Sequence, residues 1–138
     1  GLAHIARDDP DEYLAIQWLM ENVQKGDVLL EAVGESWSDH GRISGSTGIP
    51  TVLGWPWHEK QWRGSDELFK DREENVRKIY SSDDKDEVLE LIKSYSVRYI
   101  IVGKRETNLY GSGVLEQFSG MSKVVIFKGN MAIYSVLQ

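Results

Sequence analysis

Apolar residues at helical spacing alternate with short β-branched runs along most of this chain. Pro10 sits in a plausible first helical turn, and Lys25-Gly26 ends the helix that follows. The apolar residues of this helix are Tyr13, Ile16, Leu19, Met20 and Val23. Residues 28–33 are then typical of a short buried strand. This alternation favours an α/β fold in which helices flank a mainly parallel sheet.

The second half of the chain continues the alternation. The spacing of apolar residues predicts helices over 65–80 and after the acidic cap at 83–86. Residues 97–103 form the clearest strand, because they are β-branched and aromatic and end in Gly. A short helix is expected over 114–118, and a C-terminal antiparallel hairpin over 124–137.

Composition limits the classes of protein to which the chain can belong. Its 138 residues predict one domain, 1–138. The net charge of −6 argues against a general nucleic-acid binder, which needs clustered Lys and Arg. The absence of Cys excludes disulfides and thiolate metal sites. No run approaches the ~18 apolar residues that cross a bilayer, so we expect a soluble chain.

Residues 34–64 are the unusual part of the sequence. They hold four of the five Trp and two of the three His. Trp is costly to expose, and long ordered loops are usually functional, so we expect any site to lie here. Just before this segment, Glu31 interrupts an apolar strand, and a carboxylate in that position needs a partner.

Three kinds of chemistry fit this segment poorly. His58-Glu59 begins a zinc-protease spacing, but Trp62 stands where the second His is required. A hydrolase needs Ser44 or Ser46 within hydrogen-bond reach of His58, without the usual Gly-x-Ser-x-Gly turn. The glycines match neither phosphate-binding pattern. We therefore expect no catalytic residue, metal or cofactor in this chain.

Carbohydrate recognition suits the segment better, because sugars stack on Trp and pair their hydroxyls with charged side chains. A structural alternative remains open, in which the Trp residues anchor the loop and Arg42 or Arg63 pairs with Glu31. The residues available for sugar binding are Trp37, Trp55, Trp57 and Trp62 with Asp39, Arg42, His58, Glu59 and Arg63.

The order of several motifs resembles one family. These motifs are Leu30-Glu31-Ala32, Gly41-Arg42-Ile43-Ser44, Thr47-Gly48-Ile49-Pro50-Thr51-Val52-Leu53-Gly54-Trp55-Pro56, His58-Glu59 and Gln61-Trp62-Arg63-Gly64. The chain resembles the soluble C-terminal domain of the YYY family of uncharacterised archaeal and Chloroflexi-type multi-spanning membrane proteins. It departs from that family at Trp57, where Gly is more usual, and at Trp37 and His40.

The resemblance implies a parent protein with many transmembrane helices, similar in layout to GT-C glycosyltransferases that use lipid-linked sugars. A second, weaker resemblance supports the same layout. The segment Trp37-Ser38-Asp39-His40-Gly41 matches three of five positions in the Trp-Trp-Asp-Tyr-Gly motif of oligosaccharyltransferase catalytic subunits. In that class the motif helps to bind the acceptor peptide, and the catalytic acid lies in the membrane part.

The resemblance therefore implies an extracytoplasmic domain that binds an acceptor or a lipid-linked sugar beside the transmembrane region of its parent. The binding residues implied are Trp37, Asp39, Arg42, His58, Glu59, Trp62 and Arg63, with Arg side chains holding phosphate or carboxylate oxygens. The alternative is a purely structural or protein-interaction module of a membrane protein.

Overall fold

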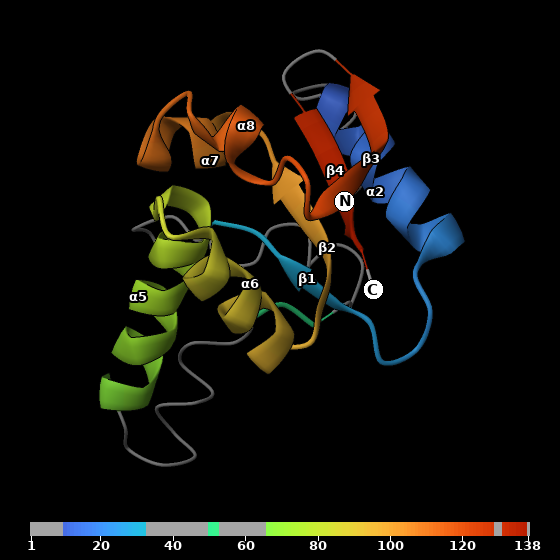
Figure 1. Cartoon of the computed structure of the whole chain (residues 1–138). Coiled ribbons are helices and arrows are strands. Elements are labelled where there is room, and N and C mark those ends of the chain that lie inside the picture. Colours follow the sequence, from blue (N-terminus) through green and yellow to red (C-terminus); the bar gives the residue numbers. More distant parts are fainter. Residues whose placement is uncertain (1–9, 33–49, 53–65, 129–130, 138) are drawn as a thin grey trace.

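The computed structural model describes residues 10–32, 50–52, 66–128 and 131–137. In this part of the chain, helices pack on both faces of a four-stranded sheet (Figure 1). The elements are α2 (Pro10–Asn22), β1 (Val28–Leu30), α5 (Asp66–Ser81), α6 (Lys85–Ser94), β2 (Val97–Val102), α7 (Lys104–Tyr110), α8 (Val114–Gln117), β3 (Ser122–Lys128) and β4 (Met131–Val136). The predicted α/β class with flanking helices is confirmed.

The sheet is mixed rather than mainly parallel, which corrects the expectation from sequence. Its strand order is β1-β2-β4-β3. Among the named strands of the described part, β1 and β2 are parallel, whereas β4 is antiparallel to both β2 and β3. The predicted C-terminal hairpin is present, and its second strand, β4, inserts beside β2. The hairpin thus supplies half of the named strands, and two of the three pairings between named strands are antiparallel.

Helix α6 shows how local sequence sets an element. Asp84 is its N-cap, and its carboxylate accepts a hydrogen bond of 3.1 Å from the backbone N–H of Glu87. Val88 and Ile92, four positions apart, are buried against the sheet side. The acidic stretch at 83–86 therefore serves as a helix cap, as predicted.

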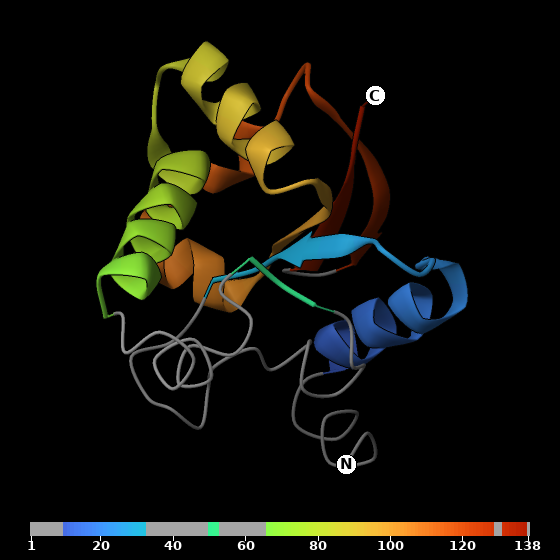
Figure 2. The ribbon, with the colours of Figure 1, turned by 90° about the horizontal axis from the view of Figure 1, so that it is seen from below.

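The core has two layers, one on each face of the sheet. Helices α5 and α6 lie on one face and α2 lies on the other (Figure 2). Along β2, Ile100 and Val102 belong to the layer beneath α5, α6 and α8, while Tyr99 and Ile101 belong to the layer beneath α2. This alternation is the period-two pattern of a strand buried on both faces.

The α2 layer differs in one detail from the predicted apolar face. Ala15, Ile16 and Leu19 are fully buried, but Met20 is 56% exposed. The residues of the buried stripe lie one, three and four positions apart, and Met20 falls outside that stripe.

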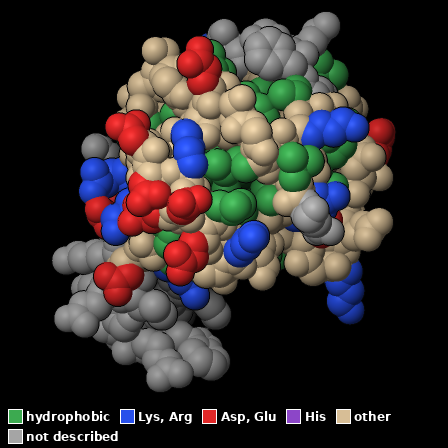
Figure 3. Space-filling model, in the orientation of Figure 1, with side chains coloured by type: hydrophobic (Ala, Val, Ile, Leu, Met, Phe, Trp, Pro, Cys, Tyr) green, Lys and Arg blue, Asp and Glu red, His purple; other side chains and the backbone are tan. Residues whose placement is uncertain are grey.

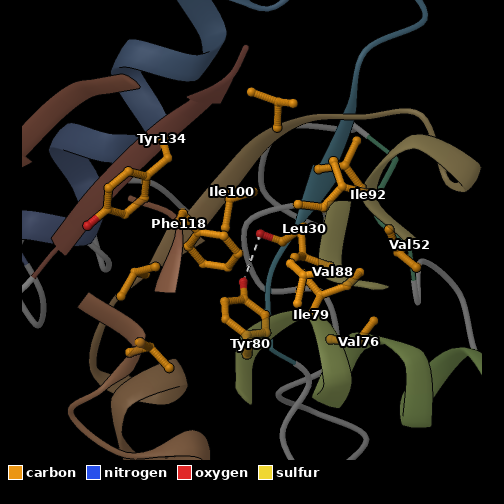
Figure 4. Packing of buried hydrophobic residues seen from close by; sticks show 14 of the residues in the cluster. Leu30, Val52, Val76, Ile79, Tyr80, Val88, Ile92, Ile100, Phe118 and Tyr134 are labelled. Atoms are coloured by element: carbon orange, nitrogen blue, oxygen red, sulfur yellow. Dashed lines mark hydrogen bonds between the residues drawn. The ribbon is translucent and has the colours of Figure 1, made fainter. Parts of the chain in front are cut away.

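The larger layer is centred on Tyr80 and Phe118. In Figure 4 the side chains of Leu30, Ile79, Val88 and Ile100 converge on this region from β1, α5, α6 and β2. The rings of Tyr80 and Phe118 meet edge to face, with 5.7 Å between centroids. This packing fixes α5 against the two parallel strands.

The surface on the side shown in Figure 3 carries many carboxylates over α5 and α6. These are solvated helix-face residues, as expected from the acidic composition of 71–86. In the part of the chain that the structure describes, no helix is both long and apolar enough to cross a membrane.

Replacing the central core residue Ile100 by Ala should lower the free energy of unfolding by about 2–5 kcal/mol, because the fully buried side chain leaves a cavity. Urea denaturation of the purified chain measures this loss. The matched control is Val124→Ala on β3, where the side chain is 48% exposed, and its cost should stay within about 0.5 kcal/mol. Equal effects at both positions would contradict the core assignment.

Candidate functional site at the carboxyl edge of the sheet

The parallel pairing of β1 with β2 brings the carboxyl ends of both strands to one edge of the sheet. A third segment joins them, because Thr51 forms a parallel bridge with Leu29. The N–H of Leu29 donates to the carbonyl of Pro50 at 2.9 Å, and the N–H of Val52 donates to the carbonyl of Leu29 at 3.1 Å. Open α/β sheets commonly bind ligands beyond such an edge.

We call the residues that follow β1 and β2, namely 31–32 and 103–106, the carboxyl edge. Its central group is the carboxylate of Glu106 in α7, which is 3% exposed. One oxygen accepts the N–H of Ala32 at 2.7 Å, and the other accepts the N–H of Gly103 at 2.7 Å. A single side chain therefore ties the end of β1 to the end of β2.

The electrostatics of Glu106 follow from this burial. Loss of water raises the pKa of its carboxyl above the ordinary Glu value. The backbone N–H groups of Ala32, Gly103 and Glu106 itself and the positive charge of Arg105 oppose that rise, because they stabilise the ionised form. Glu106 is aimed at backbone donors, so its geometry suits it to hold the chain rather than to exchange protons with a substrate.

Arg105 binds the carbonyl group of Ala32, the residue whose N–H donates to Glu106. Its Nη1 donates to the carbonyl of Ala32 at 3.3 Å and lies 3.9 Å from Oε1 of Glu31. The Glu31 side chain is 2% exposed and that of Arg105 is 23% exposed. The expectation that Glu31 needs a partner is thus met by Arg105, and the proposed pairing with Arg42 or Arg63 concerns residues outside the described part.

Tyr80 secures the edge from α5. Its hydroxyl oxygen lies 3.1 Å from the carbonyl oxygen of Leu30 (Figure 4) and 2.7 Å from that of Ile101, so its single hydrogen is shared between acceptors on the two parallel strands. Its ring stacks on that of Tyr110 with 5.0 Å between centroids and 9° between planes. Burial, assisted by the nearby negative charge of Glu106, raises the pKa of Tyr80 well above its usual value.

Arg72 of α5 holds the segment 50–52, which pairs with β1. Nη1 of Arg72 donates to the carbonyl of Val52 at 3.4 Å. Side chains from α5 and α7 therefore grip the backbone of both β1 and the 50–52 segment, just before the chain enters residues 33–49 and 53–65.

All seven binding residues expected from the sequence lie outside the described residues. Four of the five Trp residues and both candidate nucleophiles, Ser44 and Ser46, do so as well. The structure therefore neither brings these side chains together nor separates them, and the binding, hydrolase and loop-anchoring interpretations stay predictions. The seven residues are Trp37, Asp39, Arg42, His58, Glu59, Trp62 and Arg63.

Sequence reasoning missed the roles of Tyr80, Arg105 and Glu106. Helix α7, which ends at Tyr110, was not predicted. One available signal was the placement of Glu106 three positions after Gly103, where a Glu side chain can accept the N–H of the residue before a helix. Among residues 10–32, 50–52, 66–128 and 131–137, no three His, Cys, Asp or Glu side chains are grouped to hold a metal ion.

Comparison with known proteins adds a structural relationship. No family model matches the chain, and no curated protein matches it in sequence. A similar solved structure is the crystal structure of the C-terminal globular domain of oligosaccharyltransferase from Archaeoglobus fulgidus, with a TM-score of 0.56 and 14% sequence identity. The match covers 92% of this chain and 97% of that chain. The two domains share a fold.

Removing the Tyr80 hydroxyl by Tyr80→Phe should lower the free energy of unfolding by about 1–2 kcal/mol, because buried carbonyls of β1 and β2 lose their donor. Urea denaturation tests this. In the control Tyr13→Phe, the lost partner is the surface side chain of Gln17, so the change should stay within about 0.5 kcal/mol. A loss in Tyr13→Phe as large as that in Tyr80→Phe would contradict the role given to the Tyr80 hydroxyl.

The stability of the chain should also fall at high pH because of Tyr110. Burial, with the negative charges of Glu106 and Glu73, raises the pKa of Tyr110 from 10.0 to about 12. An unfolded Tyr loses its proton first as the pH rises above 10, so ionisation favours the unfolded state between pH 10 and 12. Denaturation curves from pH 9 to 11.5 should show a smaller loss for Tyr110→Phe than for the wild-type chain. Identical pH profiles would contradict this prediction.

Proposed function

We propose that this chain is an accessory domain of a membrane glycosyltransferase that uses lipid-linked sugars. In this proposal the domain binds the acceptor or the sugar and is not catalytic alone. The observation that carries the proposal is the fold shared with the C-terminal globular domain of an archaeal oligosaccharyltransferase, which extends over nearly the whole of both chains.

The position of the Trp37–Gly41 segment supports the proposal. The segment matches three of five positions of the acceptor-binding motif of oligosaccharyltransferases, and it follows Ala32 closely in sequence. Ala32 is held by both Arg105 and Glu106. A firmly held starting point limits the positions open to the residues that follow, which suits a segment that has to meet a ligand.

Within this proposal the seven candidate residues divide by chemistry. Trp37 and Trp62 supply stacking faces for a sugar ring or peptide, and Arg42 and Arg63 pair with phosphate or carboxylate oxygens. The remaining three, Asp39, His58 and Glu59, pair with hydroxyl or amide groups.

The membrane context belongs to the same proposal. The parent would be a multi-spanning protein of the YYY family with a GT-C layout, and its transmembrane region would be the partner of this domain. The domain would lie on the extracytoplasmic side, where the acceptor and the sugar carried by the lipid meet.

The binding function can be tested by nuclear magnetic resonance with the ¹⁵N-labelled chain. The probes are a polyprenyl-phosphate sugar and an Asn-x-Thr peptide, which contains the glycosylation acceptor motif, with the Gln-x-Thr peptide for comparison. We expect shift changes in residues 34–64 and at Ala32. Asp39→Asn should weaken binding about 10-fold or more, as expected when a charged hydrogen-bond acceptor is lost.

The matched control is Asp83→Asn, because Asp83 is exposed in the turn between α5 and α6. This variant should bind the probes as the wild-type chain does. Absence of shift changes with both probes, or shift changes confined to α2 and β3, would contradict the proposal and favour a structural or interaction module.

A further inference from the structure

Glu106 uses both carboxylate oxygens at once, and on two different segments. Ala32 and Gly103 follow strands that are far apart in sequence, yet their N–H groups donate to the two oxygens of one side chain, each at 2.7 Å. An ionised carboxylate accepts at both oxygens, whereas a protonated one carries a hydrogen on one of them. Only the ionised form therefore serves both backbone donors fully.

We propose that Glu106 is a proton-sensitive latch that holds the end of β1 to the end of β2 when ionised and loosens this connection when protonated. The proton must occupy an oxygen that faces either Ala32 or Gly103, and a hydroxyl oxygen is a weaker acceptor than a carboxylate oxygen. The Gly103 bond lies within the first turn of α7, whereas the Ala32 bond joins separate elements. The bond to Ala32 is the one that yields.

The charged and titratable groups around the latch come from three elements. Glu31 follows β1, Tyr80 comes from α5, and Arg105 and Tyr110 come from α7. Arg105 favours the ionised latch, since it lowers the pKa of Glu106. On the β4 side, the described neighbour of Gly103 is Met131, which does not titrate.

The pH dependence of the latch has a definite sign. Burial raises the pKa of Glu106 above its ordinary value of 4.5, so the latch takes up its proton at a higher pH than an exposed Glu does. For an acid whose folded pKa is raised, the folded state binds the proton more readily than the unfolded state, and stability from this group increases as pH falls. Protonation therefore does not destabilise the domain as a whole; the loosening is confined to the Ala32 bond, while the Glu106 carboxyl stays buried.

The latch holds Ala32, which lies just before the Trp-rich segment 34–64 in sequence. The consequence for ligand binding rests on the proposed function. Ala32 is the last described residue before 33–49. Protonation of Glu106 releases the backbone N–H of Ala32, and we expect the ligand binding proposed for residues 34–64 to weaken at low pH.

The latch can be observed without any ligand, in amide spectra of the ¹⁵N-labelled chain between pH 4 and pH 8. The amide signals of Ala32 and Gly103 should titrate together, with one midpoint above 4.5. Hydrogen exchange, corrected for its intrinsic pH dependence, should become about 10-fold faster at Ala32 below this midpoint, while that at Ile100 stays unchanged. Signals that do not titrate, or that titrate with two different midpoints, would overturn the proposal.

Variants separate the latch from a purely structural role. Glu106→Gln should abolish the shared titration and leave exchange at Ala32 fast at every pH, whereas Glu90→Gln on the exposed side of α6 should change neither. Glu31→Gln should keep the shared titration, and its loss there would assign the proton to Glu31 and overturn the latch.

Arg105→Gln provides a test that does not depend on how well Glu106→Gln folds. It keeps a side-chain donor near Ala32 but removes the positive charge, so the shared midpoint should move to higher pH. An unchanged midpoint would count against the latch. A chain that shows this titration but binds neither sugar nor peptide at any pH would refute the proposed function and leave the latch standing.

Discussion

The first strand of the sheet is only three residues long, so its place depends on side chains from two helices. Three backbone groups at its carboxyl end are held in this way. The carbonyl of Leu30 accepts from Tyr80, the N–H of Ala32 donates to Glu106, and the carbonyl of Ala32 accepts from Arg105. A short strand makes few ladder bonds, and these buried, partly charged hydrogen bonds compensate for the missing ones. The edge is therefore built jointly by β1, α5 and α7.

The carboxyl edge and the residues expected to bind a ligand are adjacent in sequence but differ in the groups that they bind. The described residues at the carboxyl edge bind backbone, whereas the Trp, His and Arg residues expected to bind a ligand follow in the next segment. The described part of this arrangement belongs to a fold shared with an archaeal oligosaccharyltransferase domain. Buried charge at the edge holds the backbone at the ends of β1 and β2.

Local patterns predicted most of the secondary structure, and long-range pairing accounts for what they missed. The helix after Asp84 and the strand 97–102 were found because capping and β-branched runs are local signals. Helix α7 was missed because its sequence, Lys104–Tyr110, has little apolar periodicity, and its buried anchor is the charged Glu106. The mixed sheet was missed because no local signal says that β4 pairs with β2. The seven candidate binding residues lie outside the described part, so their arrangement remains a prediction.

The strand order also governs how the domain can be completed during synthesis. Residues 131–136 form β4, which lies between β2 and β3 rather than at a margin of the sheet. Its side chains Ala132, Tyr134 and Val136 belong to the core layer beneath α5, α6 and α8, and Ile133 belongs to the layer beneath α2. Until these residues have left the ribosome, β2 lacks its partner and both core layers are open to water. A nascent chain that stalls before residue 131 therefore exposes the faces that chaperones bind.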